Sequence, residues 1–325
     1  MTVPFRLALA ALVVGVLAIA GADRGRAETS CYITATSLDF GMVDTTLNAP
    51  AATTGALTAT CTGDAGASVD VCVDLGAGIG GIAADGTTRY LLNNSNRLSF
   101  DLYRDAARTQ RWASAYGSAG PGDPIEIVVT LGANGTGSAS SVFWAAVAGG
   151  QGNALSGRYS TMFFGADLIA RYTAGGAGGC SGTEAIGSAS GFMRVDATVA
   201  PRCTVNATAL DFGEVGILDR NIDSTNALYV SCTSGTFYAI LLDNGQGGAI
   251  DPARRAMRSG ASRVSYGLYT NSARTVPWGD GSRGSVQAGI GTGATQQYTV
   301  YGRVPPQAAP AAGTYSDTIV VTVMY

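Results

Sequence analysis

The feature that most constrains the fold of this chain is an internal repeat. CYITATSLDFGMV at 31–43 matches CTVNATALDFGEV at 203–215, with eight of thirteen positions identical. RLSFDLYRDAARTQRW at 97–112 matches RVSYGLYTNSARTVPW at 263–278, with eight of sixteen identical. Self-similarity in a constant order indicates a tandem duplication, so we expect two domains of one fold. Two shorter matches keep the same order: LTATC (57–61) with LYVSC (228–232), and GRYS (157–160) with GTYS (313–316).

The N-terminus is typical of a secretory signal peptide. A positive charge at Arg6 precedes the 14-residue apolar run LALAALVVGVLAIA, and small residues follow with possible cleavage sites after Ala22 or Ala27. Such a run is too short for a stable membrane span. We therefore expect an exported protein. Its predicted parts are a signal peptide (1–27), an N-terminal domain (28–189), a linker or strand (190–202) and a C-terminal domain (203–325).

Composition argues against most catalytic and nucleic-acid-binding functions. The chain has no His and a net charge of −3, and charged residues make up 13% of it. The absence of His removes Ser-His-Asp and Cys-His nucleophiles and most catalytic zinc sites. The glycines of 76–81 match a dinucleotide-binding pattern, but no helix-forming sequence follows them. We expect no enzyme activity, no cofactor, no metal and no nucleic-acid partner.

The six cysteines of this exported chain predict three disulfides. Six cysteines allow 15 pairings, and the repeat reduces that number. Cys31 and Cys61 in the first copy correspond to Cys203 and Cys232 in the second. We therefore predict the pairs Cys31–Cys61 and Cys203–Cys232, which leaves Cys72 to pair with Cys180.

Both copies have the pattern of all-β domains. Short apolar or alternating runs such as SVDVCVDL, IEIVVTL and FYAILLD are separated by turns rich in Gly, Asn, Asp and Pro. Many short strands in such a length indicate a sandwich or a small barrel. We predict two tandem immunoglobulin-like β-sandwiches.

The C-terminal domain is expected to lack its last strand. In SGFMRVDATV (190–199), apolar and polar residues alternate, as in a strand that closes the first domain, although the segment may also be a plain linker. The chain ends in a predicted strand, Thr318–Tyr325, with no equivalent segment after it. A sheet edge exposed in this way needs a partner. The predicted acceptor groove has Ile319, Val321, Val323 and Tyr325 on one face, with Val320 and Met324 on the other.

Several motifs resemble those of the spore coat U domain, the subunit fold of archaic, Csu-type chaperone–usher pili. They are C-x(8)-F-G in both copies, the R-x-S-x-x-L-Y…W block, YGRVP at 301–305 and the ending G-x-Y-x-D-T-I-x-V-T-V-x-Y. The resemblance covers nearly all of the mature chain. It is looser in the first copy, where AAV replaces GRV (302–304) and the terminal Asp-Thr is absent.

This resemblance implies an assembly mechanism by donor-strand complementation. A periplasmic chaperone caps the groove, and an outer-membrane usher exchanges the chaperone for the adjacent pilin subunit. That subunit donates its N-terminal segment. Cleavage after Ala27 leaves only Glu28-Thr29-Ser30 before Cys31, too little for a donor segment. The expected protein is therefore a two-domain tip adhesin at the cell surface, which mediates attachment and biofilm formation on an abiotic or host surface.

In Csu-type tip adhesins, apolar loops of the N-terminal domain adhere to hydrophobic surfaces. Position suggests three candidate loops here, although the alignment of Trp112 with Trp278 favours a core role for that residue. Polar replacement of Ile79, Ile82 and Tyr116 is expected to reduce adhesion without loss of pili. The candidate adhesive residues are Ile79 and Ile82, Trp112 and Tyr116, and Val147 and Leu155.

Three alternatives remain open. The first is a spore-coat or other cell-surface structural protein with the same fold. A stalk pilin ranks lower because of the short N-terminus, and a secreted enzyme ranks last. Genes for a chaperone and an usher beside this one would favour the pilus.

Overall fold

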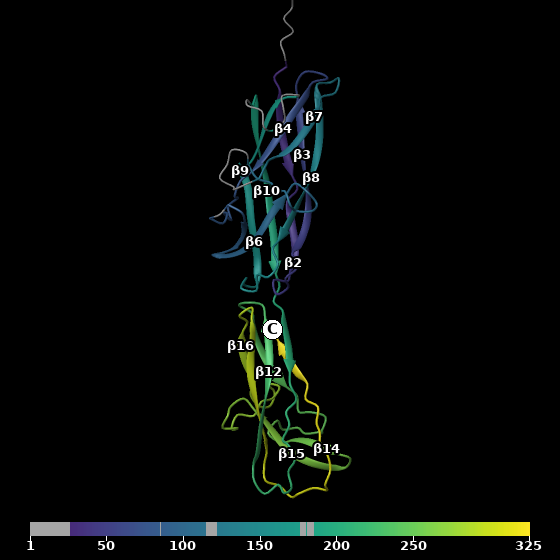
Figure 1. Cartoon of the computed structure of the whole chain (residues 1–325), viewed down its shortest axis with the longest axis vertical. Helices are drawn as coiled ribbons and strands as arrows, with labels where there is room; N and C mark the ends of the chain where they lie inside the picture. Colours follow the sequence, from purple (N-terminus) through teal and green to yellow (C-terminus); the bar gives the residue numbers. More distant parts are fainter. Residues whose placement is uncertain (1–26, 85, 115–121, 176–179, 181–184) are drawn as a thin grey trace, which may run out of the picture.

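The computed structural model describes residues 27–84, 86–114, 122–175, 180 and 185–325. These residues form two all-β domains, placed end to end, with the C-terminus near their junction (Figure 1). No α-helix occurs in the described ranges. The first domain contains β1 (Ser30–Ala35), β2 (Leu38–Val43), β3 (Ala51–Thr62), β4 (Ser68–Leu75), β5 (Arg89–Asn93), β6 (Asn96–Tyr103), β7 (Ile125–Thr130), β8 (Thr136–Val147), β9 (Gly157–Ala174) and β10 (Gly187–Val199). The second contains β11 (Cys203–Ala207), β12 (Ile222–Cys232), β13 (Phe237–Leu242), β14 (Arg255–Ser259), β15 (Ser262–Tyr269), β16 (Gln287–Ile290), β17 (Thr295–Val304) and β18 (Val321–Met324).

In the described ranges, no helix is long and apolar enough to span a membrane.

The first domain is a two-layered sandwich made from one curled sheet. One layer has the strand order β1-β3-β8-β6-β5, and the other has the order β7-β4-β9-β10-β2. The long strand β9 joins the layers, since it pairs with β10 and β4 and, at one position, with β5. Successive side chains of each strand point to opposite faces of the sheet. The inward-pointing ones from both layers fill one core.

The second domain repeats this arrangement with fewer strands. Its larger sheet has the order β11-β12-β17-β15-β14, and its smaller sheet has the order β16-β13-β18. Each of these eight strands has a counterpart in the first domain, while β2 and β10 have none among the described residues. The two sheets enclose a smaller core around Trp278.

Strand β10 forms part of the first domain. It pairs antiparallel with β9 from Gly187 to Val199 and parallel with β2 from Val195 to Val199. Its inward side chains, at Met193, Val195, Ala197 and Val199, are fully buried. Segment 190–199 is therefore a strand that completes this sheet, and it also leads to the second domain.

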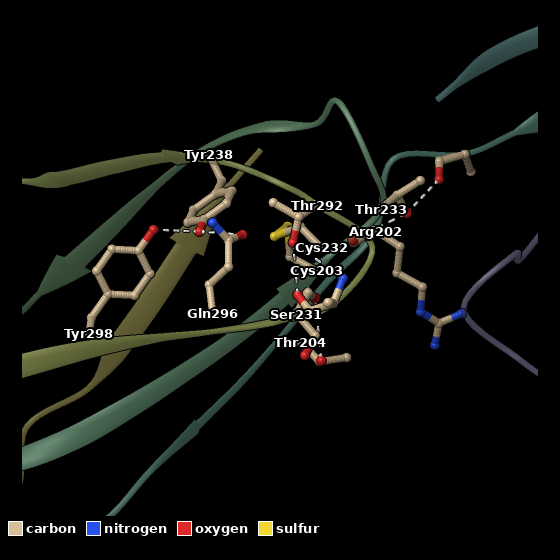
Figure 2. Close-up of a disulfide and its surroundings, with 12 residues drawn as sticks. Arg202, Cys203, Thr204, Ser231, Cys232, Thr233, Tyr238, Thr292, Gln296 and Tyr298 are labelled. Atoms are coloured by element: carbon tan, nitrogen blue, oxygen red, sulfur yellow. Dashed lines mark hydrogen bonds between the residues drawn. A yellow bond between two sulfur atoms is a disulfide. The ribbon is translucent and has the colours of Figure 1, made fainter. Parts of the chain in front are cut away.

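The structure contains the three disulfides that the repeat predicts. Cys31–Cys61 joins β1 to β3, and Cys203–Cys232 joins β11 to β12, each between residues directly opposite in the ladder. Cys72 on β4 is linked to Cys180. Figure 2 shows the Cys203–Cys232 bond beside Arg202, whose Nη1 lies 2.8 Å from Oδ2 of Asp44 in the first domain.

Candidate strand-acceptor groove

An apolar groove opens in the second domain beside its last strand. One wall is the segment 207–212, which follows β11, and the other is the segment 315–321, which leads into β18. The floor is formed by side chains of β12, β15 and β17, and the groove has a volume of about 380 Å³. The apolar lining includes Leu210, Phe212, Leu228, Leu268, Ile319 and Val321.

The groove lies where β10 lies in the first domain. Strand β10 runs between β9 and β2, and the repeat aligns β9 with 313–325 and β2 with 210–215. In the second domain, parts of these two segments, 210–212 and 315–321, lie in the walls of the groove. The groove therefore has the position that β10 has in the first domain.

The wall at 207–212 is held by packing against the floor. A Cβ on Gly302 would lie 2.9 Å from Cδ1 of Leu210 and 3.0 Å from Cζ of Phe212, so glycine at this position leaves room for both side chains. The ring of Phe212 meets that of Tyr266 edge-on, with 6.1 Å between centroids. This packing keeps two apolar side chains at the mouth of the groove.

The opposite wall is held by Asp317. Its Oδ2 accepts a 2.7 Å hydrogen bond from the hydroxyl of Tyr266, and its Oδ1 accepts backbone hydrogen bonds from Gln246 and Gly247. Burial, together with the hydrogen bond to Asp317, raises the pKa of Tyr266, so the phenol stays protonated and donates. Asp317 thus ties this wall to the loop after β13.

The last strand is shorter than expected. Strand β18 covers only Val321–Met324, not Thr318–Tyr325, because the backbone before it bonds elsewhere. The amide of Val320 donates to Oδ1 of Asp243 at 3.0 Å, and the amide of Thr318 donates to Oδ1 of Asp317. Side-chain acceptors of this kind compete with the ladder.

The side chains of the last segment alternate between its two faces. Ile319, Val321 and Val323 pack against the core of the second domain, and the first two line the groove. Val320 and Met324 point away, with 54% and 59% of their surface exposed. Neither Val323 nor Tyr325 lines the groove, so their place on the acceptor face stays a prediction, and Tyr325 is 61% exposed. It follows the end of β18, where no pairing sets its direction.

Comparison with known proteins agrees with this geometry. The family model of the spore coat protein U domain matches residues 25–162 and 189–322. The chain belongs to the spore coat protein U domain family. It is 30% identical over 154 residues to "Protein U" of Myxococcus xanthus, an alignment that covers 42% of this chain and 86% of that protein.

Two solved structures are similar to the two spore coat protein U domains, and the first of them supports their fold. The CsuC–CsuE chaperone–tip adhesin pre-assembly complex of Acinetobacter baumannii aligns with a TM-score of 0.51 at 17% identity, over 91% of this chain and 100% of that chain. The CupB6 tip adhesin of Pseudomonas aeruginosa aligns with a TM-score of 0.42 at 12% identity, over 92% of this chain and 94% of that one.

Two of the candidate adhesive residues are buried in the first spore coat protein U domain. Trp112 is fully buried, and its Nε1 donates a 2.8 Å hydrogen bond to the carbonyl of Val73. Trp278 makes the same bond to Ile240 in the second copy, at 2.9 Å. Val147 is fully buried in β8. Trp112 therefore has the core role that its alignment with Trp278 favoured, and the assignment of Val147 to an adhesive loop was wrong, because its side chain points into the sandwich.

The remaining candidates lie in different places. Ile79 is 49% exposed, and its amide donates to the carbonyl of Met162 on β9. Ile82 is partly buried and forms a β-bridge with Arg89. Leu155 forms a bridge to Ser234 of the second domain, so it belongs to the domain junction and not to an adhesive loop. Tyr116 lies outside the described residues.

Sequence reasoning missed a buried arginine in each copy. Arg89 is fully buried, and its guanidinium bonds to the carbonyl of Trp112 and to Asp101. Arg255 occupies the same place and bonds to the carbonyl of Trp278. Burial lowers the pKa of both arginines. The signal was present, since Arg precedes Trp by 23 residues in both copies.

Sequence reasoning also missed the groove wall at Leu210 and Phe212. These two residues are part of the LDFG stretch that both copies share. The sequence alone does not show that this stretch lies beside the strand at 190–199 in the first copy. Residues 38–43 pair with that strand as β2.

No group of three or more potential metal-ligating side chains occurs in the described part of the chain.

Proposed function

We propose that this chain is the tip adhesin subunit of a chaperone–usher pilus, and that its second domain accepts a donor strand from the adjacent subunit. The observation that carries the proposal is the apolar groove in the second domain, at the position that β10 fills in the first. An added strand would lie between the two walls and cover their apolar side chains.

The pairing of β10 in the first domain supports a definite geometry for such a strand. Strand β10 is antiparallel to β9 and parallel to β2, with four alternate side chains buried. By the repeat, a donor strand in the second domain runs antiparallel to 315–321 and parallel to 207–212. It presents apolar side chains at every second position to Leu210, Phe212 and Ile319.

The partners and the location follow from this proposal. The similar structure from Acinetobacter baumannii is a chaperone–tip subunit pre-assembly complex, which supports a periplasmic chaperone as partner here. An outer-membrane usher and the adjacent pilin complete the assembly. The chain then passes through the periplasm to the pilus tip at the cell surface, and it catalyses no reaction.

Adhesion is assigned to the first domain, because the second is occupied by fibre assembly. Ile79 is the candidate adhesive residue that the structure leaves half exposed. Replacement by Asn is expected to reduce attachment to an abiotic or host surface, and with it biofilm formation, while pili remain. Equal attachment by piliated cells would contradict this assignment.

A groove substitution in cells that make the fibre tests the central claim. Leu210→Glu places a carboxylate in the groove, where burial without a partner costs more than the 1.4 kcal/mol that changes a binding constant tenfold. We expect at least about a tenfold loss of this chain from purified pili. Val205→Glu, at an exposed position of β11, is the matched control.

The two outcomes separate the candidate functions. Wild-type incorporation of Leu210→Glu would show that the groove does not join the chain to a fibre. A chain found in a surface layer of cells that make no usher-dependent fibre would favour the alternative, a structural coat protein with the same fold.

A further inference from the structure

The outer face of the smaller sheet in the second domain is apolar and bare. Strand β13 reads FYAILL, and its inward residues Tyr238, Ile240 and Leu242 are buried in the core. Phe237, on the other face, is 73% exposed. We call this face the β13 outer face, and none of its side chains carries a charge. The strand registers place on it Phe237, Ala239, Leu241, Ala288, Ile290, Thr322 and Met324.

The largest exposed side chains of the β13 outer face lie near one another. Ile290 is directly opposite Phe237 across the β13–β16 pair, and Met324 is opposite Ala239 across the β13–β18 pair. Ile290 is 50% exposed and Met324 is 59% exposed. Contiguous exposed apolar surface on a soluble domain marks an interaction site.

The first domain has a different surface at the same positions. The matching tryptophan bonds to Val73 and Ile240 align β4 with β13, so Asp70, Cys72 and Asp74 take the places of Phe237, Ala239 and Leu241. These three residues are 4%, 8% and 1% exposed. Strand β4 is therefore buried on both faces, whereas β13 is buried on one.

Two described residues contact the outer face of β4: Cys180 at Cys72, and Arg171 of β9, which pairs with Asp74. Cys72 is bonded to Cys180, which lies in sequence between β9 and β10. One continuous piece of chain thus contacts the outer face of β4 at Cys180 and then fills the sheet as β10. A run such as FYAILL, apolar at every position, is typical of strands buried on both faces. The second domain has the sequence of a covered strand without the cover.

We propose that the donor segment which fills the groove of the second domain also covers the β13 outer face with the residues that precede its groove-filling stretch. This inference rests on the proposed function. The direction of β10 supports it, because β10 begins opposite Tyr172, near the end of β9. A donor strand in the same direction begins beside the end of β18, where Met324 lies.

The chemistry of the β13 outer face defines the residues that cover it. It offers no ion pair, so the covering residues are uncharged and apolar, and they come before the alternating stretch of the donor. Such a donor is longer at its N-terminus than the groove alone requires. Covering Phe237, Ile290 and Met324 adds apolar burial at about 25 cal/mol per Å² to the strength of the joint.

Photo-crosslinking in assembled pili tests this inference. In separate full-length chains, a benzoylphenylalanine replaces Phe237 on the outer face, Leu210 in the groove, or Ala261 in the β14–β15 turn as a control. That turn lies at the opposite end of the second domain (Figure 1). Phe237 is 73% exposed, so its replacement does not disturb the core. Crosslinked peptides are identified by mass spectrometry.

We expect position 237 to capture the N-terminal segment of another subunit, at a yield at least about tenfold above position 261. The captured residues should precede, in the same segment, those captured at position 210. One result would overturn the inference and leave the proposed function standing. In that result, position 210 captures an N-terminal segment, while position 237 captures nothing, or captures the body of a subunit, or captures a second copy of this chain. If position 210 captures no N-terminal segment, the proposed function fails, and this inference fails with it.

Discussion

One stretch of sequence has two different structures in this molecule. LDFGMV at 38–43 is strand β2 of the first domain, whereas LDFGEV at 210–215 forms no strand in the second. Locally the two are alike. In each, the carboxylate of the Asp accepts a 2.8 Å hydrogen bond from the amide of the Gly two residues later, and that Gly has a positive φ of 65° or 74°.

The difference comes from one neighbour. Residues 38–43 pair with β10, which leaves Leu38 and Val43 3% and 4% exposed. Residues 210–215 have no such neighbour among the described strands, and Val215 is 43% exposed. Local sequence sets the turn at the Gly, and the partner strand decides whether the flanking residues become part of a sheet.

The largest expected effect comes from disrupting β10. Val195→Asp places a carboxylate where the side chain is fully buried, and burial of an unpaired charge is among the few causes of losses above about 4 kcal/mol. We expect the first domain to unfold at much lower denaturant, as measured by hydrogen exchange for each domain separately. Phe192→Asp, at a 55% exposed position of the same strand, should change stability little.

The corresponding change in the second domain allows the stability losses of the two domains to be compared. Ile319→Asp alters a groove wall that is only partly buried, so we expect a loss of about 1–2 kcal/mol in the isolated chain. Equal losses at the two positions would mean that the second domain is already complete.

Removing each of the two equivalent disulfides in turn compares how much each one stabilises its domain. Cys31–Cys61 and Cys203–Cys232 close loops with separations of 30 and 29 residues. Chain entropy gives about 3.5 kcal/mol for each. Replacing both cysteines of one pair by Ser should therefore lower the unfolding free energy equally in the two domains. A larger loss in the second domain would mean that its open sandwich depends more strongly on the tether.

Truncation of the repeated leucine gives a smaller effect. Leu38→Ala removes a side chain that is 3% exposed, and we expect about 3 kcal/mol of destabilisation in the first domain. Leu210→Ala removes a partly exposed one, and we expect about 1 kcal/mol in the isolated chain. Addition of a donor strand should increase the effect of Leu210→Ala. An effect that stays unchanged would show that the strand does not pack on Leu210.

The smallest effect is a pH dependence specific to the second domain. The hydrogen bond from Arg303 lowers the pKa of Asp223, and residue 52, its counterpart in the first domain, is Ala. A lowered carboxyl pKa stabilises the fold above the unfolded pKa near 3.9, and that stabilisation is lost as the pH falls through the folded pKa.

The size of this effect is limited by exposure. Asp223 is partly exposed, so solvent screening keeps the contribution below about 1 kcal/mol. Thermal unfolding of Asp223→Asn should show less loss between pH 5 and pH 2 than that of the unchanged chain. An identical acid response in the two proteins would contradict the assignment.

Much of the architecture could be predicted from the repeat. It predicted two all-β domains and the pairing of Cys31, Cys61, Cys203 and Cys232, because related sequences place related residues in the same ladder. The alternation in 190–199 indicated a strand buried on one face, which β10 is.

The details of the groove could be predicted only in part. Alternation distinguished Ile319 and Val321 from Val320, but the hydrogen bond from Val320 to Asp243 that shortens β18 links residues 77 positions apart. The alignment with Trp278 favoured the core role of Trp112, but the loop assignment of Val147 failed because a turn-rich sequence does not reveal which apolar residue points inward.

The sequence by itself determined the duplication, the strands and the cysteine pairs, because these depend on spacing and periodicity along the chain. Only the tertiary structure decided that LDFG is a sheet edge in one copy and a groove wall in the other. It also decided that the outer face of β13 lies bare where that of β4 is covered. Both outcomes depend on whether a neighbouring segment is present to supply backbone hydrogen bonds and apolar cover, and such neighbours are distant in sequence.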